Sequence, residues 1–248
     1  MKDNFSAQSN LYAAFRPHYP QQLYDFIFQH VKKFNTALDI ATGNGQVAAA
    51  LAKKFKEVHA TDISEKQLAN APQLPNVFYK AEPAEQTSFA SNYFDLITVA
   101  QAVHWFQFEK FYTEINRILK KDGLLIIAGY GLLRVNKAID EWTDYYYKEI
   151  TGPYWDKERK YIDEGYTTIP FPLKEINSPQ LFMNYTWSRE HFTGYLQTWS
   201  AFQHYVKKNG TSPLSHELLQ QLYTLWHKDD LNEVRFPLFI RAGLLPNS

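Results

Sequence analysis

Two glycines and two aspartates in the first third of the chain have a spacing that suits the binding of an adenosine cofactor. The segment Asp39-Ile-Ala-Thr-Gly43-Asn-Gly45 follows a short β-prone run, and Asp62 ends the next one. Glycines let a backbone approach a ligand closely because they carry no Cβ atom. A carboxylate in the place of Asp62 can accept hydrogen bonds from ribose hydroxyls. The glycines would equally suit a tight turn without a ligand, and the pattern alone also fits a dinucleotide.

The position of Asp39 favours S-adenosylmethionine over NAD as this cofactor. NAD places its pyrophosphate at the N-terminus of the helix after the glycines, where a nearby carboxylate would repel the phosphates. S-adenosylmethionine has no phosphate, and its ammonium and sulfonium groups would be stabilised by a carboxylate. The alternatives are an NAD-dependent oxidoreductase and a protein that binds S-adenosylmethionine or its product without catalysis. For Asp39 itself, the alternative is a residue that caps the turn.

A histidine in the loop after the fourth predicted strand is the candidate for acid–base chemistry. His104 follows the run Phe94-Asp-Leu-Ile-Thr-Val99, and the ordinary pKa of histidine suits proton transfer near neutral pH. If the cofactor is S-adenosylmethionine, transfer of its methyl group needs a base only when the accepting group arrives protonated. For a hydroxyl acceptor we expect His104 to be that base, and for a carboxylate we expect an arginine such as Arg134 or Arg189 to matter more. The alternative is a structural histidine beside Trp105.

Aromatic residues are concentrated in the second half of the chain, where we expect a cap over the substrate. All six tryptophans lie after residue 100. Tyr154 and Trp155 lie on an irregular stretch, and with Trp105 they are the predicted contacts to an apolar or aromatic part of the acceptor. Trp142 and Trp199 have helical spacing, and for them we expect core positions.

These residues need a scaffold that brings distant segments together. Between residues 36 and 128, β-prone runs alternate with helical patterns, which is typical of a parallel sheet with helices on both faces. Ligands bind beyond the carboxyl ends of such strands, where Asp39, Asp62 and His104 lie. We therefore predict an α/β fold, a Rossmann-like seven-stranded mostly parallel sheet sandwiched by helices, with an aromatic-rich helical cap. The predicted strands are 36–40, 58–60, 77–79, 94–99, 124–127, 182–187 and 234–242.

Segments along the whole chain resemble motifs of class I S-adenosylmethionine-dependent methyltransferases. The glycine motif is resembled by Leu38-Asp-Ile-Ala-Thr-Gly-Asn-Gly45, the ribose-binding acid by Asp62-Ile-Ser64, and the adenine loop by Pro83-Ala-Glu85. The segment after the fourth strand is resembled by Ala100-Gln-Ala-Val-His-Trp105, and the turn into the fifth strand by Leu119-Lys-Lys-Asp-Gly-Leu124. The chain is similar to bacterial methyltransferases of the type 11 group, whose relatives include trans-aconitate methyltransferase. The resemblance implies methyl transfer to a small organic molecule, at a carboxylate or hydroxyl oxygen.

The resemblance also implies which residues surround the cofactor. Ile63 would lie flat on the adenine, and Tyr12 and Arg16 would cover the methionine end, with Arg16 binding its carboxylate. The alternatives are a core isoleucine and a solvated surface arginine. Together with the residues above, the predicted cofactor contacts are Tyr12, Arg16, Asp39, Ala41, Gly43, Gly45, Asp62, Ile63, Ala84, Glu85 and Ala100.

Two positions depart from the family pattern. Ala41 stands where many members have a glycine, which narrows the space for the cofactor. Pro83 stands where others have a side chain able to bind the adenine amino group. Adenine recognition would then pass to the backbone near Ala84 and to Glu85 or Glu82.

Composition excludes several classes of partner and site. The 26 basic and 26 acidic residues cancel, so no overall field would attract a nucleic acid or an anionic membrane. No cysteine is present, which excludes thiolate metal sites and a cysteine nucleophile, and we predict no metal. Because no signal-peptide pattern and no run of transmembrane length is found, we expect a cytoplasmic protein. We also expect a monomer or homodimer.

The 248 residues suit one large domain with an insertion. We expect residues 1–35 to form an N-terminal helical segment that closes over the cofactor, and 36–130 to form the cofactor-binding core. Residues 131–180 would be the substrate cap insertion, and 181–248 would supply C-terminal strands and helices that complete the sheet and the cap.

Overall fold

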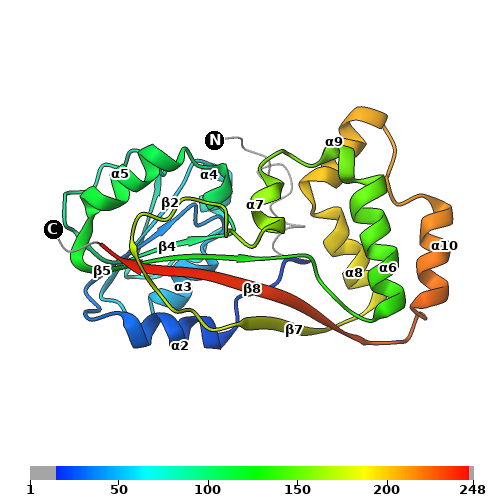
Figure 1. Ribbon diagram of the computed structural model, residues 1–248, viewed down its shortest axis with the longest axis horizontal. Coiled ribbons are helices and arrows are strands. Elements are labelled where there is room, and N and C mark those ends of the chain that lie inside the picture. Colours follow the sequence, from blue (N-terminus) through cyan, green and yellow to red (C-terminus); the bar gives the residue numbers. More distant parts are fainter. Residues whose placement is uncertain (1–14, 246–248) are drawn as a thin grey trace.

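One mixed β-sheet lies at the centre of the computed structural model, which describes residues 15–245 (Figure 1). The strands are β1 (Thr36–Ile40), β2 (Glu57–Asp62), β3 (Val77–Ala81), β4 (Phe94–Ala100), β5 (Leu119–Tyr130), β6 (Lys174–Ile176), β7 (Leu181–Trp187) and β8 (Asn232–Leu244). Their order is β3-β2-β1-β4-β5-β8-β6, and β7 also pairs with β8. β1 to β5 pair in parallel, whereas β8 is antiparallel to β5, β6 and β7. The predicted α/β fold with a mostly parallel sheet is confirmed.

The sheet has eight strands where seven were predicted. The additional strand, β6, pairs with the carboxyl end of β8, where Lys174 lies opposite Leu244. β7 pairs with the first half of β8, where Trp187 lies opposite Asn232. The two short strands therefore share one side of the long β8. β6 has three residues, which is too short for a periodicity to reveal it.

Helices pack on both faces of the sheet and beside it. They are α2 (Gln21–His30), α3 (Gln46–Leu51), α4 (Glu65–Ala69), α5 (Phe108–Ile118), α6 (Lys137–Tyr145), α7 (Arg159–Asp163), α8 (Arg189–Gln197), α9 (Ser200–Asn209) and α10 (His216–Leu225). α2 and α3 lie on one face, and α5 lies on the other (Figure 1). Within residues 15–245, no helix is long and apolar enough to cross a membrane.

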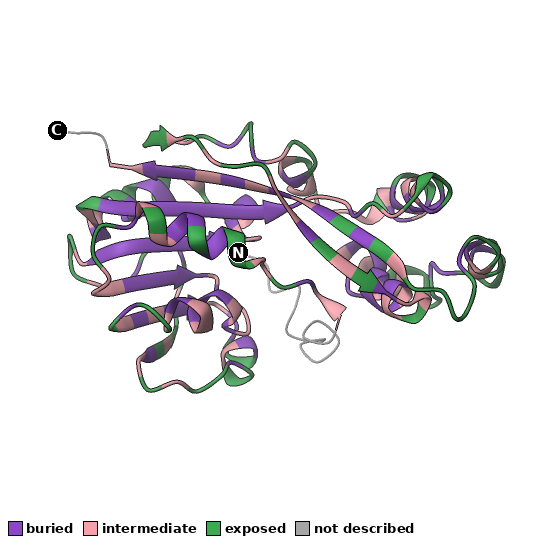
Figure 2. Cartoon of the chain, turned by 90° about the horizontal axis from the view of Figure 1, so that it is seen from below, coloured by how far each residue is buried: buried purple, intermediate pink, exposed green. Residues whose placement is uncertain are grey.

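Alternating side chains along the strands explain these layers. Ala37 and Leu96 belong to the core that packs against α2 and α3, whereas the next residues, Leu38 and Ile97, belong to the core that packs against α5. Successive side chains of a strand point to opposite faces, so strands covered on both faces carry continuous apolar runs. The burial colours of Figure 2 show these central strands buried along most of their length.

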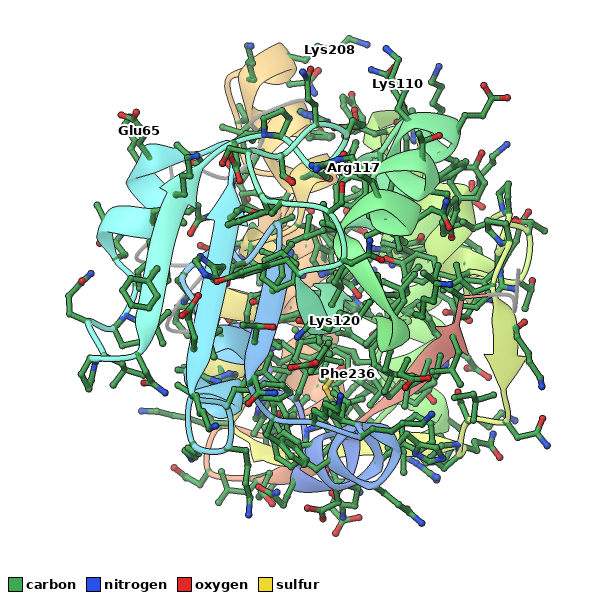
Figure 3. All side chains as sticks on the ribbon, turned by 90° about the vertical axis from the view of Figure 1, so that its left-hand side faces the viewer. Glu65, Lys110, Arg117, Lys120, Lys208 and Phe236 are labelled. Atoms are coloured by element: carbon green, nitrogen blue, oxygen red, sulfur yellow. The ribbon has the colours of Figure 1, made fainter. Side chains whose placement is uncertain are left out.

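A helical lobe, made of α6, α8, α9 and α10, stands beside the sheet near the start of β8 (Figure 1). Its interior is aromatic: Trp142, Trp199 and Trp226 are 6%, 2% and 0% exposed, and the Trp142 ring stacks on that of Tyr146 at 5.3 Å. The predicted core positions of Trp142 and Trp199 are confirmed. Charged side chains such as Lys208 extend from the surface instead (Figure 3).

Candidate functional site

A cleft opens at the carboxyl ends of β1 and β4, the edge of the sheet at which the sequence predicts a ligand. Its cavity volume is about 90 Å³, and it opens to solvent. Residues predicted to contact the cofactor line it: Arg16, Asp39, Ala41, Gly43 and Ala100. The sheet topology therefore brings together residues from the N-terminal segment, the glycine turn and the end of β4.

The turn between β1 and α3 uses its two glycines differently. Gly45 has a φ of +79°, and a Cβ atom there would lie 2.7 Å from the Tyr79 hydroxyl. Gly43 has a φ of +58°, and a Cβ atom there would meet nothing within 4 Å. Glycine adopts such positive φ values without strain. Gly45 thus permits close packing beneath the turn, while Gly43 leaves space in the cleft that it lines.

Asp39 brings a buried carboxylate to the wall of the cleft. The residue is 1% exposed, and it accepts hydrogen bonds from the hydroxyls of Thr42 at 2.5 Å and Thr98 at 2.8 Å. Thr98 lies directly opposite Asp39 in the parallel register of β1 and β4. Burial raises the pKa of Asp39 to about 6 in spite of these hydrogen bonds. At neutral pH the cleft wall therefore holds a desolvated negative charge that a ligand cation would stabilise.

Asp62 ends β2 and connects the glycine turn to that strand. One carboxylate oxygen accepts a hydrogen bond from the Gly43 N–H at 2.9 Å, and the other accepts one from the Ser64 N–H at 2.8 Å. A carboxylate oxygen can accept more than one hydrogen bond, so a ribose hydroxyl could share this carboxylate. Asp62 and Ile63 are half-buried, and neither lines the cleft in the described part of the chain. Their predicted contacts with the adenosine stay predictions.

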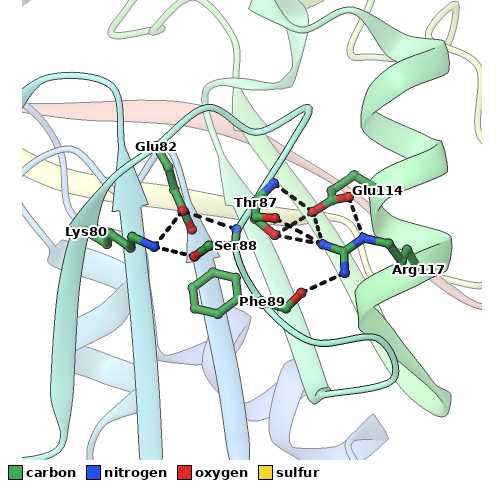
Figure 4. A network of polar contacts seen from close by, with 7 residues as sticks. All are labelled: Lys80, Glu82, Thr87, Ser88, Phe89, Glu114 and Arg117. Atoms are coloured by element: carbon green, nitrogen blue, oxygen red, sulfur yellow. Dashed lines mark hydrogen bonds and ion pairs between the residues drawn. The ribbon is translucent and has the colours of Figure 1, made fainter.

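The loop after β3 is fastened to α5 by a polar network (Figure 4). The Glu114 carboxylate accepts hydrogen bonds from the Thr87 N–H at 2.8 Å and from Arg117 at 2.6 Å and 2.9 Å. Arg117 also donates to the Phe89 carbonyl at 2.6 Å. At the start of the loop, Glu82 accepts from Lys80 at 3.1 Å and from the Ser88 N–H at 3.2 Å. These contacts fix the loop predicted to frame the adenine.

Ala84 and Glu85 lie within this loop. Ala84 is 2% exposed, and the Glu85 carboxylate accepts a hydrogen bond from the N–H of Gln107, just before α5, at 3.0 Å. The structure gives Glu85 a positioning role that the sequence did not reveal. The predicted contact of these two residues with adenine stays a prediction.

A second, smaller cavity, with a volume of about 40 Å³, adjoins the cleft. The two cavities share Arg16 and Gln101. His104, Trp105 and Trp155, predicted to act on or contact the acceptor, line the second cavity. A ligand in the cleft and a ligand in the second cavity would therefore meet at Arg16 and Gln101.

The junction is held by contacts to Tyr130 at the end of β5. Arg16 donates to the Tyr130 hydroxyl at 2.9 Å and to the Thr198 carbonyl at 3.0 Å. The Gln101 side chain accepts from the Tyr130 N–H at 2.8 Å and donates to its carbonyl at 3.2 Å. Gln101 has a φ of +53°, which costs a non-glycine residue about 1–3 kcal/mol. Sequence reasoning missed Gln101, since such a conformation is uncommon outside Gly, Asn and Asp and leaves no signal in residue type.

His104 is buried in the short 3-10 turn Val103–Trp105 and is 4% exposed. Its Nδ1 is hydrogen-bonded to the Tyr166 hydroxyl at 2.8 Å. Burial, reinforced by the positive charge of Arg159, lowers the pKa of His104 to about 3. The expectation of an ordinary histidine pKa is therefore wrong: this imidazole is neutral at pH 7 and only weakly basic.

The predicted ligand contact Tyr154 packs against α9. The Tyr154 hydroxyl accepts a hydrogen bond from Asn209 on α9 at 2.9 Å, and its ring packs against Tyr205 at 4.8 Å. Tyr154 lines neither cavity within the described residues, and its predicted contact with the acceptor stays a prediction. α9 binds this side chain, and only the neighbouring Trp155 reaches the cavity. Tyr12 lies outside the described residues.

The two arginines expected to matter for a carboxylate acceptor, Arg134 and Arg189, contact other residues. Arg134 pairs with Asp144 at 2.8 Å, and the Arg189 guanidinium lies over the Tyr223 ring at 3.8 Å. In the described chain neither arginine lines the second cavity, whereas Arg159 does. Arg134 and Arg189 are both engaged by neighbouring residues, and their expected role with a carboxylate acceptor stays a prediction.

Several known proteins that match nearly the whole chain are assigned as methyltransferases. Residues 38–127 match a family described as a methyltransferase domain. A Dictyostelium discoideum protein assigned as a methyltransferase is 35% identical over 245 residues, which cover 96% of this chain and 93% of that protein. A Saccharomyces cerevisiae protein assigned as an S-adenosylmethionine-dependent methyltransferase is 22% identical over 92% of this chain and 91% of its own. A solved structure from Anaeromyxobacter dehalogenans, assigned as a type II methyltransferase, is 35% identical with a TM-score of 0.86, and covers 94% of this chain and 100% of that one.

These similarities extend over nearly the whole chain, well beyond the glycine turn. The matched residues 38–127 include Asp39, both glycines and the end of β4, and so contain most of the predicted cofactor contacts. The alternative of an NAD-dependent oxidoreductase is wrong. The chain belongs to the class I S-adenosylmethionine-dependent methyltransferases.

Proposed function

We propose that this enzyme binds S-adenosylmethionine in the cleft and transfers its methyl group to an oxygen of a small organic acceptor in the second cavity. The proposal depends above all on one observation, the junction of the two cavities at Arg16 and Gln101. A methyl donor on one side and an acceptor on the other would be held face to face there. The accepting oxygen belongs to a carboxylate or a hydroxyl.

The residues of the cleft suit this cofactor. The buried Asp39 carboxylate offers a desolvated charge to the ammonium group, and Gly43 leaves open space beside it. Arg16 can bind the carboxylate of the methionine end. When bound, S-adenosylmethionine supplies a methyl group that is already activated by the positive charge on its sulfur.

The residues of the chain would contribute alignment and exclusion of water rather than acid–base chemistry. In-line methyl transfer depends on the distance and angle between nucleophile, methyl carbon and sulfur. Trp105 and Trp155 give the second cavity apolar walls, which exclude water from the acceptor. His104 supports this wall through its hydrogen bond to Tyr166.

Calorimetry with S-adenosylhomocysteine, and with NAD as the control ligand, tests the cleft. We expect binding of the first and none of the second. Transfer of a tritiated methyl group should then be measured with small molecules, protein and nucleic acid as separate acceptors. Label on a small molecule supports the proposal, while label on a macromolecule alone contradicts it. Binding without transfer to any acceptor would favour the non-catalytic alternative.

Adjacent residues offer a matched pair of variants. Trp155 lines the second cavity, whereas Tyr154 packs against α9. We expect Trp155→Ala to reduce methyl transfer while S-adenosylhomocysteine binds as before, and Tyr154→Ala to leave the transfer rate nearly unchanged. Equal losses in both variants would place the acceptor elsewhere.

A further inference from the structure

An arginine held between aromatic rings forms one wall of the second cavity. The guanidinium carbon of Arg159 lies 4.5 Å from the centre of the Trp155 ring and 5.2 Å from that of Tyr147. Its Nε donates a hydrogen bond to the Tyr147 hydroxyl at 2.8 Å, and that hydroxyl donates to Asp163 at 2.7 Å. Ring contacts and hydrogen bonds thus fix the guanidinium before a ligand arrives.

The local backbone is shaped to build this support. After α6 the chain forms a π-helical turn, Tyr146–Ile150, followed by the 3-10 turn Gly152–Tyr154. These turns bring the Trp155 indole to the carbonyl of Tyr147, to which it donates a hydrogen bond at 3.3 Å. π-helical turns are rare and frequently occur at functional sites. The unusual backbone therefore places both rings that hold Arg159.

Arg159 retains donors for a ligand. Within residues 15–245, its hydrogen bonds all come from Nε, to Tyr147 at 2.8 Å and to Asp163 at 3.3 Å. In that part of the chain no partner is found for Nη1 or Nη2. The Arg159 side chain is 17% exposed, so solvent reaches it only in part. Two guanidinium nitrogens form a fork that matches the two oxygens of a carboxylate.

The charges that line the second cavity also favour an anion. In the described lining, Arg16 and Arg159 are positively charged and Asp156 is negatively charged. His104 is neutral, because burial lowers its pKa. Asp163, which contacts Arg159 from outside this lining, has a side chain that is 46% exposed, so water screens its charge. In the described lining of the ligand-free protein, positive charges therefore outnumber negative ones. Once Arg16 binds the carboxylate of the methionine end, Arg159 is the cation left in this lining to face an anionic acceptor.

We propose that the acceptor is an organic carboxylate and that Arg159 is the residue that binds it, an inference that rests on the proposed function. An ionised carboxylate oxygen attacks the methyl carbon, the new C–O bond forms as the C–S bond breaks, and the electron pair of that bond stays on sulfur. The products are a methyl ester and S-adenosylhomocysteine, and no proton moves. A hydroxyl acceptor would need a base, and His104 is too weakly basic for that task.

Calorimetric titration of the protein saturated with S-adenosylhomocysteine tests the inference. The probes are benzoate, indole-3-acetate and succinate, each compared with its primary amide. We expect at least one acid to bind more tightly than its amide. Arg159→Gln should weaken that binding roughly 10- to 100-fold, the range for lost hydrogen bonds to a charged group. Arg159→Lys, which keeps the charge but not the fork, should weaken it less.

The matched control is Arg134→Gln, because Arg134 pairs with Asp144 away from the cavity. The Arg134→Gln variant should bind the acid as tightly as the wild type does. Calorimetry with S-adenosylhomocysteine reports whether each variant keeps its fold and its cleft. If Arg159→Gln does not fold, the acid affinity of Arg159→Lys tests the role of Arg159 instead. The acid that binds should also accept the tritiated methyl group as an alkali-labile ester.

The failures of the two proposals are distinguishable. Equal binding of acids and amides, no binding of any acid, an alkali-stable product, or an acid preference that survives in Arg159→Gln would each overturn the inference about Arg159. None of these outcomes affects the binding of S-adenosylhomocysteine. If the wild type fails to bind S-adenosylhomocysteine, the proposed function itself is refuted.

Discussion

Replacement of Asp39 by asparagine tests whether the buried negative charge, which destabilises the ligand-free protein, serves to bind the cofactor. Asp39→Asn keeps the shape of the side chain and removes its charge. Burial raises the pKa of Asp39 from the ordinary value of 3.8 to about 6, and this difference of about two units corresponds to about 3 kcal/mol. Because asparagine carries no charge to desolvate, we expect Asp39→Asn to increase the free energy of unfolding of the ligand-free protein by up to about 3 kcal/mol at pH 7.

The increase in the free energy of unfolding caused by Asp39→Asn should grow as the pH rises. The folded pKa of Asp39 lies above the unfolded one, so between about pH 4 and pH 6 the native state binds more protons than the unfolded state. The contribution of Asp39 to stability therefore falls as the pH rises through this window. The advantage of Asp39→Asn should be below about 1 kcal/mol at pH 4 and reach its full value near pH 7.

Urea denaturation of the ligand-free proteins at several pH values measures the stability, and calorimetry measures the affinity for S-adenosylmethionine. Asp39→Asn should bind S-adenosylmethionine roughly 10- to 100-fold more weakly, because the ammonium group of the cofactor loses a charged partner. Asp95→Asn is the matched control, since this buried carboxylate is already compensated by Lys120 at 2.8 Å. Asp95→Asn should destabilise the protein and leave cofactor affinity unchanged. Equal destabilisation by both variants, with unchanged cofactor affinity in Asp39→Asn, would refute the reasoning.

Three further changes probe the turn, the loop and the histidine. Asp62→Ala should weaken S-adenosylhomocysteine binding roughly 10- to 100-fold through lost charged hydrogen bonds, and unchanged affinity by calorimetry would move the adenosine elsewhere. Gly45→Ala should lower the urea midpoint more than Gly43→Ala, because only the first adds a 2.7 Å contact, with Tyr79, to the strain of a positive φ. His104→Gln should change turnover less than tenfold, below the 10²–10⁴-fold typical of a lost base. The wild-type kcat should show no inflection near pH 6.5, since burial lowers the pKa of His104 to about 3.

The position of the cleft could be predicted from the sequence because it depends on topology. Parallel strands place their carboxyl ends at one edge of the sheet, so Asp39 and Ala100 had to lie close once both were assigned to strand ends. The pairing of Asp39 with Thr98 needed the register of β1 and β4, which a one-residue shift would have changed. A single sequence contains no direct measure of that register.

The acceptor cavity could not be predicted in the same way. Trp155 and Tyr154 are adjacent and both aromatic, yet one lines the cavity and the other packs on α9. The π-helical turn Tyr146–Ile150 decides this difference, and its residues have no composition that distinguishes it from the α-helix before it. The same turn helps to place Arg159. Residue type alone could not distinguish Arg159 from Arg134 and Arg189 as a partner for a carboxylate.

Strained backbone gathers around the two cavities. Among the four non-glycine residues with positive φ in the described chain, Ala41 and Gln101 line the cleft, and Tyr166 is hydrogen-bonded to His104. Each such conformation costs about 1–3 kcal/mol, and the buried charge of Asp39 adds a term of similar size. These unfavourable terms must be offset by the apolar cores on both faces of the sheet. A substitution that relieves one of them should therefore stabilise the fold and weaken ligand binding together, since the strained and charged groups are those that face the ligand.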